Sequence, residues 1–253
     1  MKNVIILGSG RSGTSMVAGS LRLAGYGMGA GLKAGTPSNP LGYFESVEIN
    51  DINEDLLRPV TAGLAGHPVD GVPHPVMAKD QHWLACLPRG VNVGPVPGVE
   101  ARMAAAAARR PFCFKDPRFS YTLPLWRPHL GPDTLFVCVF REPGRTVTSM
   151  MKDAAEQEYL RGLGLTPWFA YRVWIHMYDR IVNEHCRRGR WLFLHYDQVI
   201  SGEGLRRLAR ALEAPVDETF PTPALKRSAE GGQVPLQARL LYLKMKFLSW
   251  VTR

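Results

Sequence analysis

The sequence has few cysteines, no long apolar run and no metal-binding pattern. Its four cysteines form no close pair, so their spacing indicates neither a disulfide framework nor a metal site. No segment approaches the roughly 18 uncharged apolar residues of a membrane span. The apolar run after Lys2 is too short for a secretory leader. These absences predict a soluble, cytoplasmic protein that holds no metal.

Acidic residues are also scarce. The chain of 253 residues has 31 Lys and Arg against 22 Asp and Glu, a net charge of +9. This excess suits a polyanionic ligand. Nucleic acid is one such ligand, but zinc-finger spacing, a helix-turn-helix pattern and aromatic ribonucleoprotein motifs are all missing. A small anionic ligand is therefore favoured as the partner, and no nucleic acid is expected.

A glycine-rich loop lies between an apolar run and a predicted helix near the N-terminus. Val4–Leu7 has the pattern of a buried strand, and the helix is expected over Thr14–Leu23. Backbone N–H groups of such a loop, together with the helix N-terminus, converge on a phosphate-like anion. The predicted anion-binding residues are Gly10, Arg11, Ser12, Gly13, Thr14 and Ser15.

Two nucleotide-binding patterns overlap on this loop, and each lacks one residue. Gly8, Gly10 and Gly13 have dinucleotide-site spacing, but the acidic residue expected about 20 positions on is missing. A nucleotide-phosphate loop would have Lys where Thr14 stands. The nearest cation is Arg11. A loop with a basic residue two positions before Gly-Thr-Ser resembles the 5′-phosphosulfate loop of sulfotransferases.

A second motif strengthens this resemblance. The apolar run Leu135–Phe140 predicts a central strand, and Pro143 suits the first turn of the next helix. Arg141 ends the strand, and Ser149 follows eight positions later. This pair resembles the arginine and serine with which sulfotransferases grip the 3′-phosphate of their donor. The two motifs, each after an apolar strand, together indicate this family.

Further segments resemble the bacterial, carbohydrate-type branch of the sulfotransferases. They are Asn39–Glu45, Phe114–Arg118, the strand that leads to Tyr196, and the basic segment Leu225–Ser228. The resemblance implies 3′-phosphoadenosine 5′-phosphosulfate as donor and no metal. It also implies a hydroxyl acceptor on a sugar, a glycolipid or a secondary metabolite. The donor-binding residues that it implies are those of the glycine-rich loop and, in addition, Arg141, Ser149, Tyr196, Arg227 and Ser228.

The resemblance also implies roles in the reaction. Arg11 would neutralise the bridging oxygen as the bond to sulfur breaks. Lys115 ends a predicted strand and would face the sulfuryl group, or alternatively pair with Asp116 or another carboxylate. Glu45 would be the base, in an apolar setting expected to raise its pKa, or would instead stabilise the dipole of the next helix. Asp116 is the next candidate for the base.

Two other functions remain open on the sequence. A phosphotransferase or kinase needs a carboxylate near its magnesium ion, and Asp116 after a predicted strand provides one. A non-catalytic nucleotide-binding protein would bind the donor without turnover.

The pattern of the whole chain predicts one α/β domain, P-loop-like, with a central parallel sheet flanked by helices. Predicted strands alternate with helices, which places ligands at the carboxyl ends of the strands. The Pro- and Gly-rich stretch at about 59–100 is too irregular for a core element and is expected to form an insertion or lid. Leu236–Val251 is expected to be a docking helix; a basic amphipathic membrane helix is the alternative. The strands are expected at Asn3–Leu7, Phe112–Lys115, Leu135–Phe140 and Trp191–His195.

Overall fold

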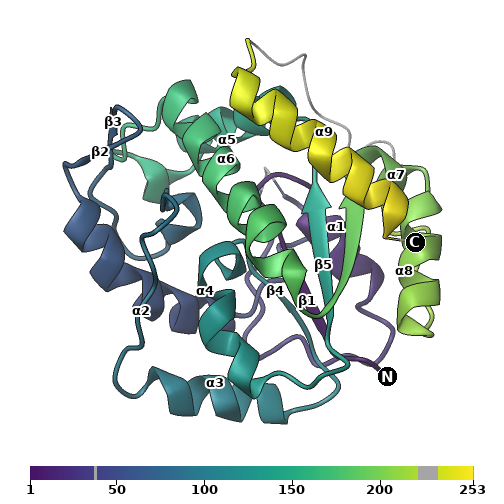
Figure 1. The fold of residues 1–253 in the computed structure, drawn as a ribbon. Coiled ribbons are helices and arrows are strands. Elements are labelled where there is room, and N and C mark those ends of the chain that lie inside the picture. Colours follow the sequence, from purple (N-terminus) through teal and green to yellow (C-terminus); the bar gives the residue numbers. More distant parts are fainter. Residues whose placement is uncertain (37–38, 222–232, 253) are drawn as a thin grey trace.

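The computed structural model describes residues 1–36, 39–221 and 233–252. A parallel sheet of four strands lies at its centre, in the order β4-β1-β5-β6 (Figure 1). The predicted α/β class and parallel sheet are confirmed, and each expected strand is found within one residue of its predicted bounds. The strands are β1 (Val4–Leu7), β4 (Cys113–Lys115), β5 (Leu135–Phe140) and β6 (Arg190–His195).

Alternate side chains of the strands pack into two different apolar layers, because successive residues of a strand point to opposite faces. Ile5, Phe136 and Phe193 contribute to one layer, and Val4, Val137 and Leu194 to the other. The first layer is covered by α2 (Val47–Leu64), α3 (Val99–Ala108), α4 (Phe119–Trp126), α6 (Pro167–Asn183) and α9 (Leu236–Val251). The second is covered by α1 (Thr14–Ser20), α7 (Tyr196–Ile200) and α8 (Glu203–Leu212).

Local capping explains where several helices begin. The side chain of Ser46 accepts a hydrogen bond from the backbone N–H of Ile49 at the start of α2. Glu142 accepts from two backbone N–H groups at the start of α5 (Pro143–Glu156), which has Pro in its first turn. Helix α1 stops at Ser20, short of the predicted end at Leu23, and α2 continues through Pro59 to Leu64.

The stretch at 59–100 contributes side chains to the core, although its sequence is irregular. It contains the hairpin of β2 (Pro68–Val69) and β3 (Val72–Pro73) and the short 3₁₀ helix η1 (His82–Leu84). Leu84–Leu87 are fully buried among side chains of α5 and α6. Hydrophobic contacts thus hold Leu84–Leu87 in place, although the sequence around them has no helical or strand periodicity. Its role as a lid remains a prediction.

The strand order defines where a ligand can approach the sheet. The chain leaves β1 toward β4 on one side, whereas it leaves β5 toward β6 on the other. A crevice is expected outside the carboxyl ends of the strands at such a reversal. The backbones are close there, since a Cβ on Gly8 would lie 2.2 Å from the carbonyl oxygen of Val139. Only glycine fits this position, with its φ of +134°.

Candidate functional site

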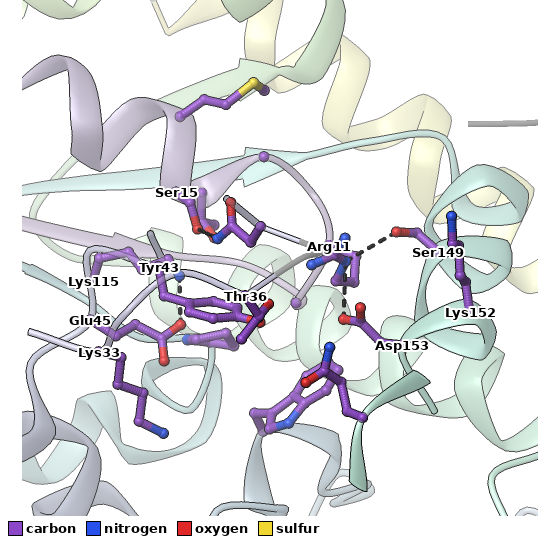
Figure 2. A pocket seen from close by; sticks show the side chains of 18 of the residues that line it. Arg11, Ser15, Lys33, Thr36, Tyr43, Glu45, Lys115, Ser149, Lys152 and Asp153 are labelled. Carbon is purple, nitrogen blue, oxygen red and sulfur yellow. Dashed lines mark hydrogen bonds and ion pairs between the residues drawn. The ribbon is translucent and has the colours of Figure 1, made fainter. Parts of the chain in front are cut away.

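A cavity of about 1120 Å³ lies at the carboxyl edge of the sheet (Figure 2). Ligand pockets commonly have about 300–1,000 Å³, so this cavity is large enough for a small-molecule ligand. It is bounded by the loop after β1, the ends of β4 and β5, and one side of α5. The predicted site residues that line it are Gly10, Arg11, Gly13, Thr14, Ser15, Glu45, Lys115, Arg141, Ser149 and Tyr196.

Three predicted donor-binding residues are not among those that line the cavity. Ser12 is buried, and its Oγ lies 2.9 Å from the hydroxyl of Tyr178 in α6. Its side chain therefore faces the core, so only its backbone is part of the predicted anion-binding loop. Arg227 and Ser228 lie outside the described residues, and their predicted role is not tested.

The loop after β1 has an unusual backbone. Arg11 has a φ of +67° and Gly13 a φ of +95°, both in the left-handed region. Non-glycine residues at positive φ are uncommon and often mark functional sites. Gly10 is held against Trp83, because a Cβ there would come within 2.5 Å of the indole ring. Trp83, in the stretch at 59–100, therefore packs directly against the loop.

Arg11 points across the cavity to α5, as Figure 2 shows. Its Nε lies 3.0 Å from Ser149 Oγ and 3.2 Å from Asp153 Oδ2. Ser149 and Asp153 are one helical turn apart, so both contact the same guanidinium group. Sequence reasoning placed Ser149 beside Arg141; in this structure Ser149 accepts a hydrogen bond from Arg11. The ion pair with Asp153 fixes the direction of Arg11.

Arg141 directly follows β5 and lies over the aromatic ring of Tyr196, with its guanidinium carbon 4.1 Å from the ring centroid. Burial lowers the pKa of Arg141, and Arg11 and Arg145 act in the same direction. Tyr196 and the nearby Asp197 oppose this shift. A buried guanidinium group that faces a cavity favours an anion there, because an anion would offset the desolvation of the charge.

Glu45 and Lys115 form an ion pair in the cavity wall. Lys115 Nζ donates to Glu45 Oε1 at 2.5 Å, and both residues are mostly buried. Burial alone would raise the pKa of Glu45, but the charges of Lys115, Arg118 and Lys33 outweigh it. The pKa of Glu45 is therefore lowered, which corrects the expectation that its apolar setting would raise it. The carboxyl group is ionised at neutral pH.

Each carboxylate of the described cavity wall is paired with a basic residue of the same wall. Besides the pairs of Arg11 and Lys115, Lys33 Nζ lies 2.9 Å from Asp80 and Lys152 Nζ 3.6 Å from Glu156. Arg118 and Arg141 line the wall as well. Basic groups therefore outnumber acidic ones around the cavity, which favours an anionic ligand.

Asp116 does not face the cavity. It is fully buried and accepts hydrogen bonds from the side-chain amides of Asn50 and Asn53 and from Arg118. Lys115 therefore pairs with Glu45 rather than with Asp116. With its oxygens engaged in this way, Asp116 holds α2 to the end of β4 and is unsuited to act as the alternative base.

Arg118 also pairs with Glu54, which in turn contacts His82. Arg118 Nη2 and His82 Nδ1 each lie 2.5 Å from a carboxylate oxygen of Glu54. Burial alone would raise the pKa of Glu54, but His82 and Arg118 lower it from 4.5 to about 2. This network joins α2 to η1, and it holds the stretch at 59–100 in position next to Arg118, which lines the cavity.

Glu54→Gln is expected to destabilise the protein by about 3–5 kcal/mol at pH 7, because it leaves Arg118 as a buried charge that has lost one of its carboxylate partners. A lowered folded-state pKa gives stability that is complete above pH 4.5 and is lost as the pH falls toward about 2. The difference between wild type and variant in urea unfolding should therefore be constant above pH 4.5 and shrink below it. The exposed Glu100→Gln is the matched control, and a pH-independent difference would contradict this account.

Several residues of the cavity wall were not predicted from the sequence. Asp153 follows Ser149 by one helical turn, so helical spacing alone would have placed it there. Trp83 and Tyr159 come from short 3₁₀ helices far apart in the sequence, and Trp83 Nε1 donates to the Tyr159 hydroxyl at 3.2 Å. No sequence pattern indicates this contact.

Within residues 1–36, 39–221 and 233–252, no group of three His, Cys, Asp or Glu side chains is arranged to hold a metal ion. None of the described helices has both the length and the apolar character needed to cross a membrane. Each of the four cysteines is free, and Cys113 and Cys138 are buried in strands of the sheet as expected.

The fold and the crevice at the strand reversal define a P-loop-like α/β protein. The chain is similar in structure to the sulfotransferase domain from the curacin biosynthetic pathway, with 13% sequence identity, 97% of each chain covered and a TM-score of 0.53. A sulfotransferase from Mycobacterium avium is 14% identical and has a TM-score of 0.47, over 100% of this chain and 69% of that one. A sulfotransferase from Mycobacterium tuberculosis H37Rv is also 14% identical and has a TM-score of 0.45. That comparison covers 98% of this chain and 71% of the other.

At such identities, the similarity to the curacin-pathway domain shows the fold alone. No protein-family model matches the sequence, and no curated protein does. An assignment of function therefore has to rest on the site itself.

Proposed function

We propose that the protein is a sulfotransferase that moves a sulfuryl group from 3′-phosphoadenosine 5′-phosphosulfate to a hydroxyl group of an acceptor. The observation that carries this proposal is the position of Arg11 and Arg141. The two motifs are 130 residues apart in the sequence (11 to 141), yet both arginines line one cavity at the strand reversal. This supports a ligand with two separate anionic groups, as the donor has.

The loop residues Gly10, Gly13, Thr14 and Ser15 would hold the 5′-phosphosulfate, and Arg141 with Tyr196 would hold the 3′-phosphate end. In the reaction the bond between sulfur and the bridging oxygen breaks, and a bond between sulfur and the acceptor oxygen forms. The bridging oxygen keeps the electron pair and gains negative charge. A fixed cation at that oxygen stabilises the transition state more than the bound donor. Arg11, directed by Asp153, would provide it.

Glu45 would accept the proton of the acceptor hydroxyl, and Lys115 would orient the Glu45 carboxylate. A base must be ionised before it can act, and the lowered pKa of Glu45 provides this at neutral pH. Lys115 Nζ holds one carboxylate oxygen, Oε1, at 2.5 Å. Both side chains line the cavity, so the acceptor would enter on their side.

A phosphotransferase and a non-catalytic nucleotide-binding protein are the alternatives. The phosphotransferase interpretation relied on Asp116, which the structure places in a buried network away from the cavity. No other observation favours either alternative. A screen of hydroxyl acceptors with sulfur-labelled donor tests the proposal: label should pass to a sugar, a glycolipid or a secondary metabolite. Labelled phosphate transfer from ATP instead would contradict it.

Arg141→Ala is expected to weaken the binding of 3′,5′-adenosine diphosphate about 10- to 150-fold, because a buried charge-assisted contact contributes about 1.5–3 kcal/mol. Binding of 5′-adenosine monophosphate, which lacks the 3′-phosphate, should change much less. Isothermal titration calorimetry of both nucleotides measures the difference, with the exposed Arg210→Ala as control. Equal weakening of both nucleotides would show that Arg141 does not bind the 3′-phosphate.

A further inference from the structure

Helix α9 is apolar on two opposite sides. Its inward side packs against α6 and β6 through Ala238, Leu241 and Met245, all buried. Its outward side carries a second apolar row, named here the outer stripe, whose members are 59–70% exposed. They follow one another at intervals of three or four residues and so share one side of the helix. The outer stripe consists of Leu236, Leu240, Leu243, Phe247 and Trp250.

A row of this kind is unusual on a protein surface. Single exposed apolar residues are common, but a contiguous apolar patch marks an interaction site. Figure 1 shows α9 at the periphery of the fold, with one side turned away from the other elements. A helix that is apolar on both sides requires a cover for the second side. The charges around the outer stripe indicate which cover fits.

Only basic charges flank the outer stripe on α9. Leu236–Val251 contains no Asp or Glu. Helical spacing places Arg239 and Lys246 along one side of the outer stripe and Lys244 along the other. All three residues are exposed. A second copy of the chain is disfavoured as cover, because a symmetric contact through α9 would bring the same basic flanks together.

We propose that the outer stripe of α9 binds the surface of an anionic lipid bilayer. Exposed Leu, Phe and Trp side chains between basic residues are the composition of helices that lie in the membrane interface. Trp is favoured at that depth, and Lys and Arg contact anionic headgroups. The 16 residues of α9 would lie on the bilayer rather than cross it. This inference stands independently of the proposed sulfotransferase activity.

The position of α9 links the bilayer contact to the cavity. Tyr242 of α9 contacts His195 at the carboxyl end of β6, with 2.9 Å between the hydroxyl oxygen and Nε2. Nearby, Gln237 at the first turn of α9 contacts Arg172 of α6. Binding through the outer stripe would therefore bring the carboxyl edge of the sheet, which carries the cavity, near the lipid surface.

The test is co-sedimentation of the full chain with vesicles of phosphatidylcholine, with and without phosphatidylglycerol. Wild type should bind the anionic vesicles, and high salt should weaken the binding. The triple variant Leu240→Gln, Leu243→Gln, Phe247→Gln should lose at least about tenfold in partitioning. Lys244→Gln and Lys246→Gln should each cost about fivefold, since one basic residue near the surface contributes about 1 kcal/mol.

Matched controls are Leu23→Gln and Val76→Gln, which replace apolar residues that are 77% and 79% exposed elsewhere on the surface. Both should bind vesicles as wild type does. Circular dichroism and thermal unfolding verify that the triple variant is folded, which is expected because the substituted side chains are exposed.

Three outcomes would overturn the proposal. Wild type that does not bind anionic vesicles is one, and a folded triple variant that binds like wild type is another. The third comes from light scattering: a wild-type dimer that the triple variant converts to a monomer would assign the outer stripe to a second copy of the chain.

Discussion

Replacement of Arg11 by alanine is expected to lower turnover about 10²–10³-fold while donor affinity falls much less. The negative charge on the bridging oxygen grows as its bond to sulfur breaks, so a cation there acts mainly in the transition state. Arg11 is directed into the cavity by Asp153 and Ser149. Steady-state kinetics should therefore show the loss in kcat, with little change in the affinity for 3′,5′-adenosine diphosphate.

Arg11→Lys separates charge from loop geometry. Lysine retains the charge but cannot make the same paired contacts to Ser149 and Asp153. It is expected to keep part of the activity that Arg11→Ala loses. Arg210→Ala on the exposed surface of α8 is the control for unspecific effects of charge removal. If Arg11→Ala left turnover within about a factor of two of wild type, Arg11 would only shape the loop.

Glu45→Gln is expected to lower turnover about 10²–10⁴-fold, the usual contribution of a general base. Glutamine has nearly the same size and can still contact Lys115, but it cannot accept the proton of the acceptor hydroxyl. Donor affinity should remain near the wild-type value, because Glu45 is assigned to the acceptor side. Single-turnover measurement of sulfuryl transfer tests this directly, with Glu203→Gln on α8 as control. Near-normal turnover would place the base elsewhere.

The pH profile gives an independent test of Glu45. A base acts only when deprotonated, so activity falls as the pH drops through its folded-state pKa. Because Lys115, Arg118 and Lys33 outweigh burial and lower that pKa, any loss of activity assigned to Glu45 should be centred below pH 4.5. An acidic limb centred near pH 6 that disappears in Glu45→Gln would instead mean that burial dominates the pKa.

The sheet and the anion-binding motifs could be predicted from the sequence because they depend on local patterns. The apolar run Leu135–Phe140 is a strand in the structure with the same bounds. Gly8 and Gly13 stand where the backbone has positive φ. Arg11 and Arg141 each follow a strand, and parallel strands place their carboxyl ends at one edge. Local chemistry and sheet topology together were sufficient to bring these residues into one cavity.

Long-range packing and charge could not be predicted in this way. Leu84–Leu87 are buried although their stretch is rich in Pro and Gly, because neighbouring helices provide the contacts. The pKa of Glu45 depends on Lys115, which is 70 residues away in the sequence. The neighbours of Glu45 in sequence are apolar and suggested the opposite shift. Only the tertiary structure shows which charges surround a buried group.

Titration of the wild-type protein with 3′,5′-adenosine diphosphate, with magnesium and with a chelator, tests the central proposal most directly. It needs no knowledge of the acceptor, because this nucleotide is the product that the donor leaves behind. We expect tight binding that is the same under both conditions and much weaker binding of ATP. Magnesium-dependent binding of ATP without measurable binding of 3′,5′-adenosine diphosphate would contradict the assignment of this cavity to sulfuryl transfer.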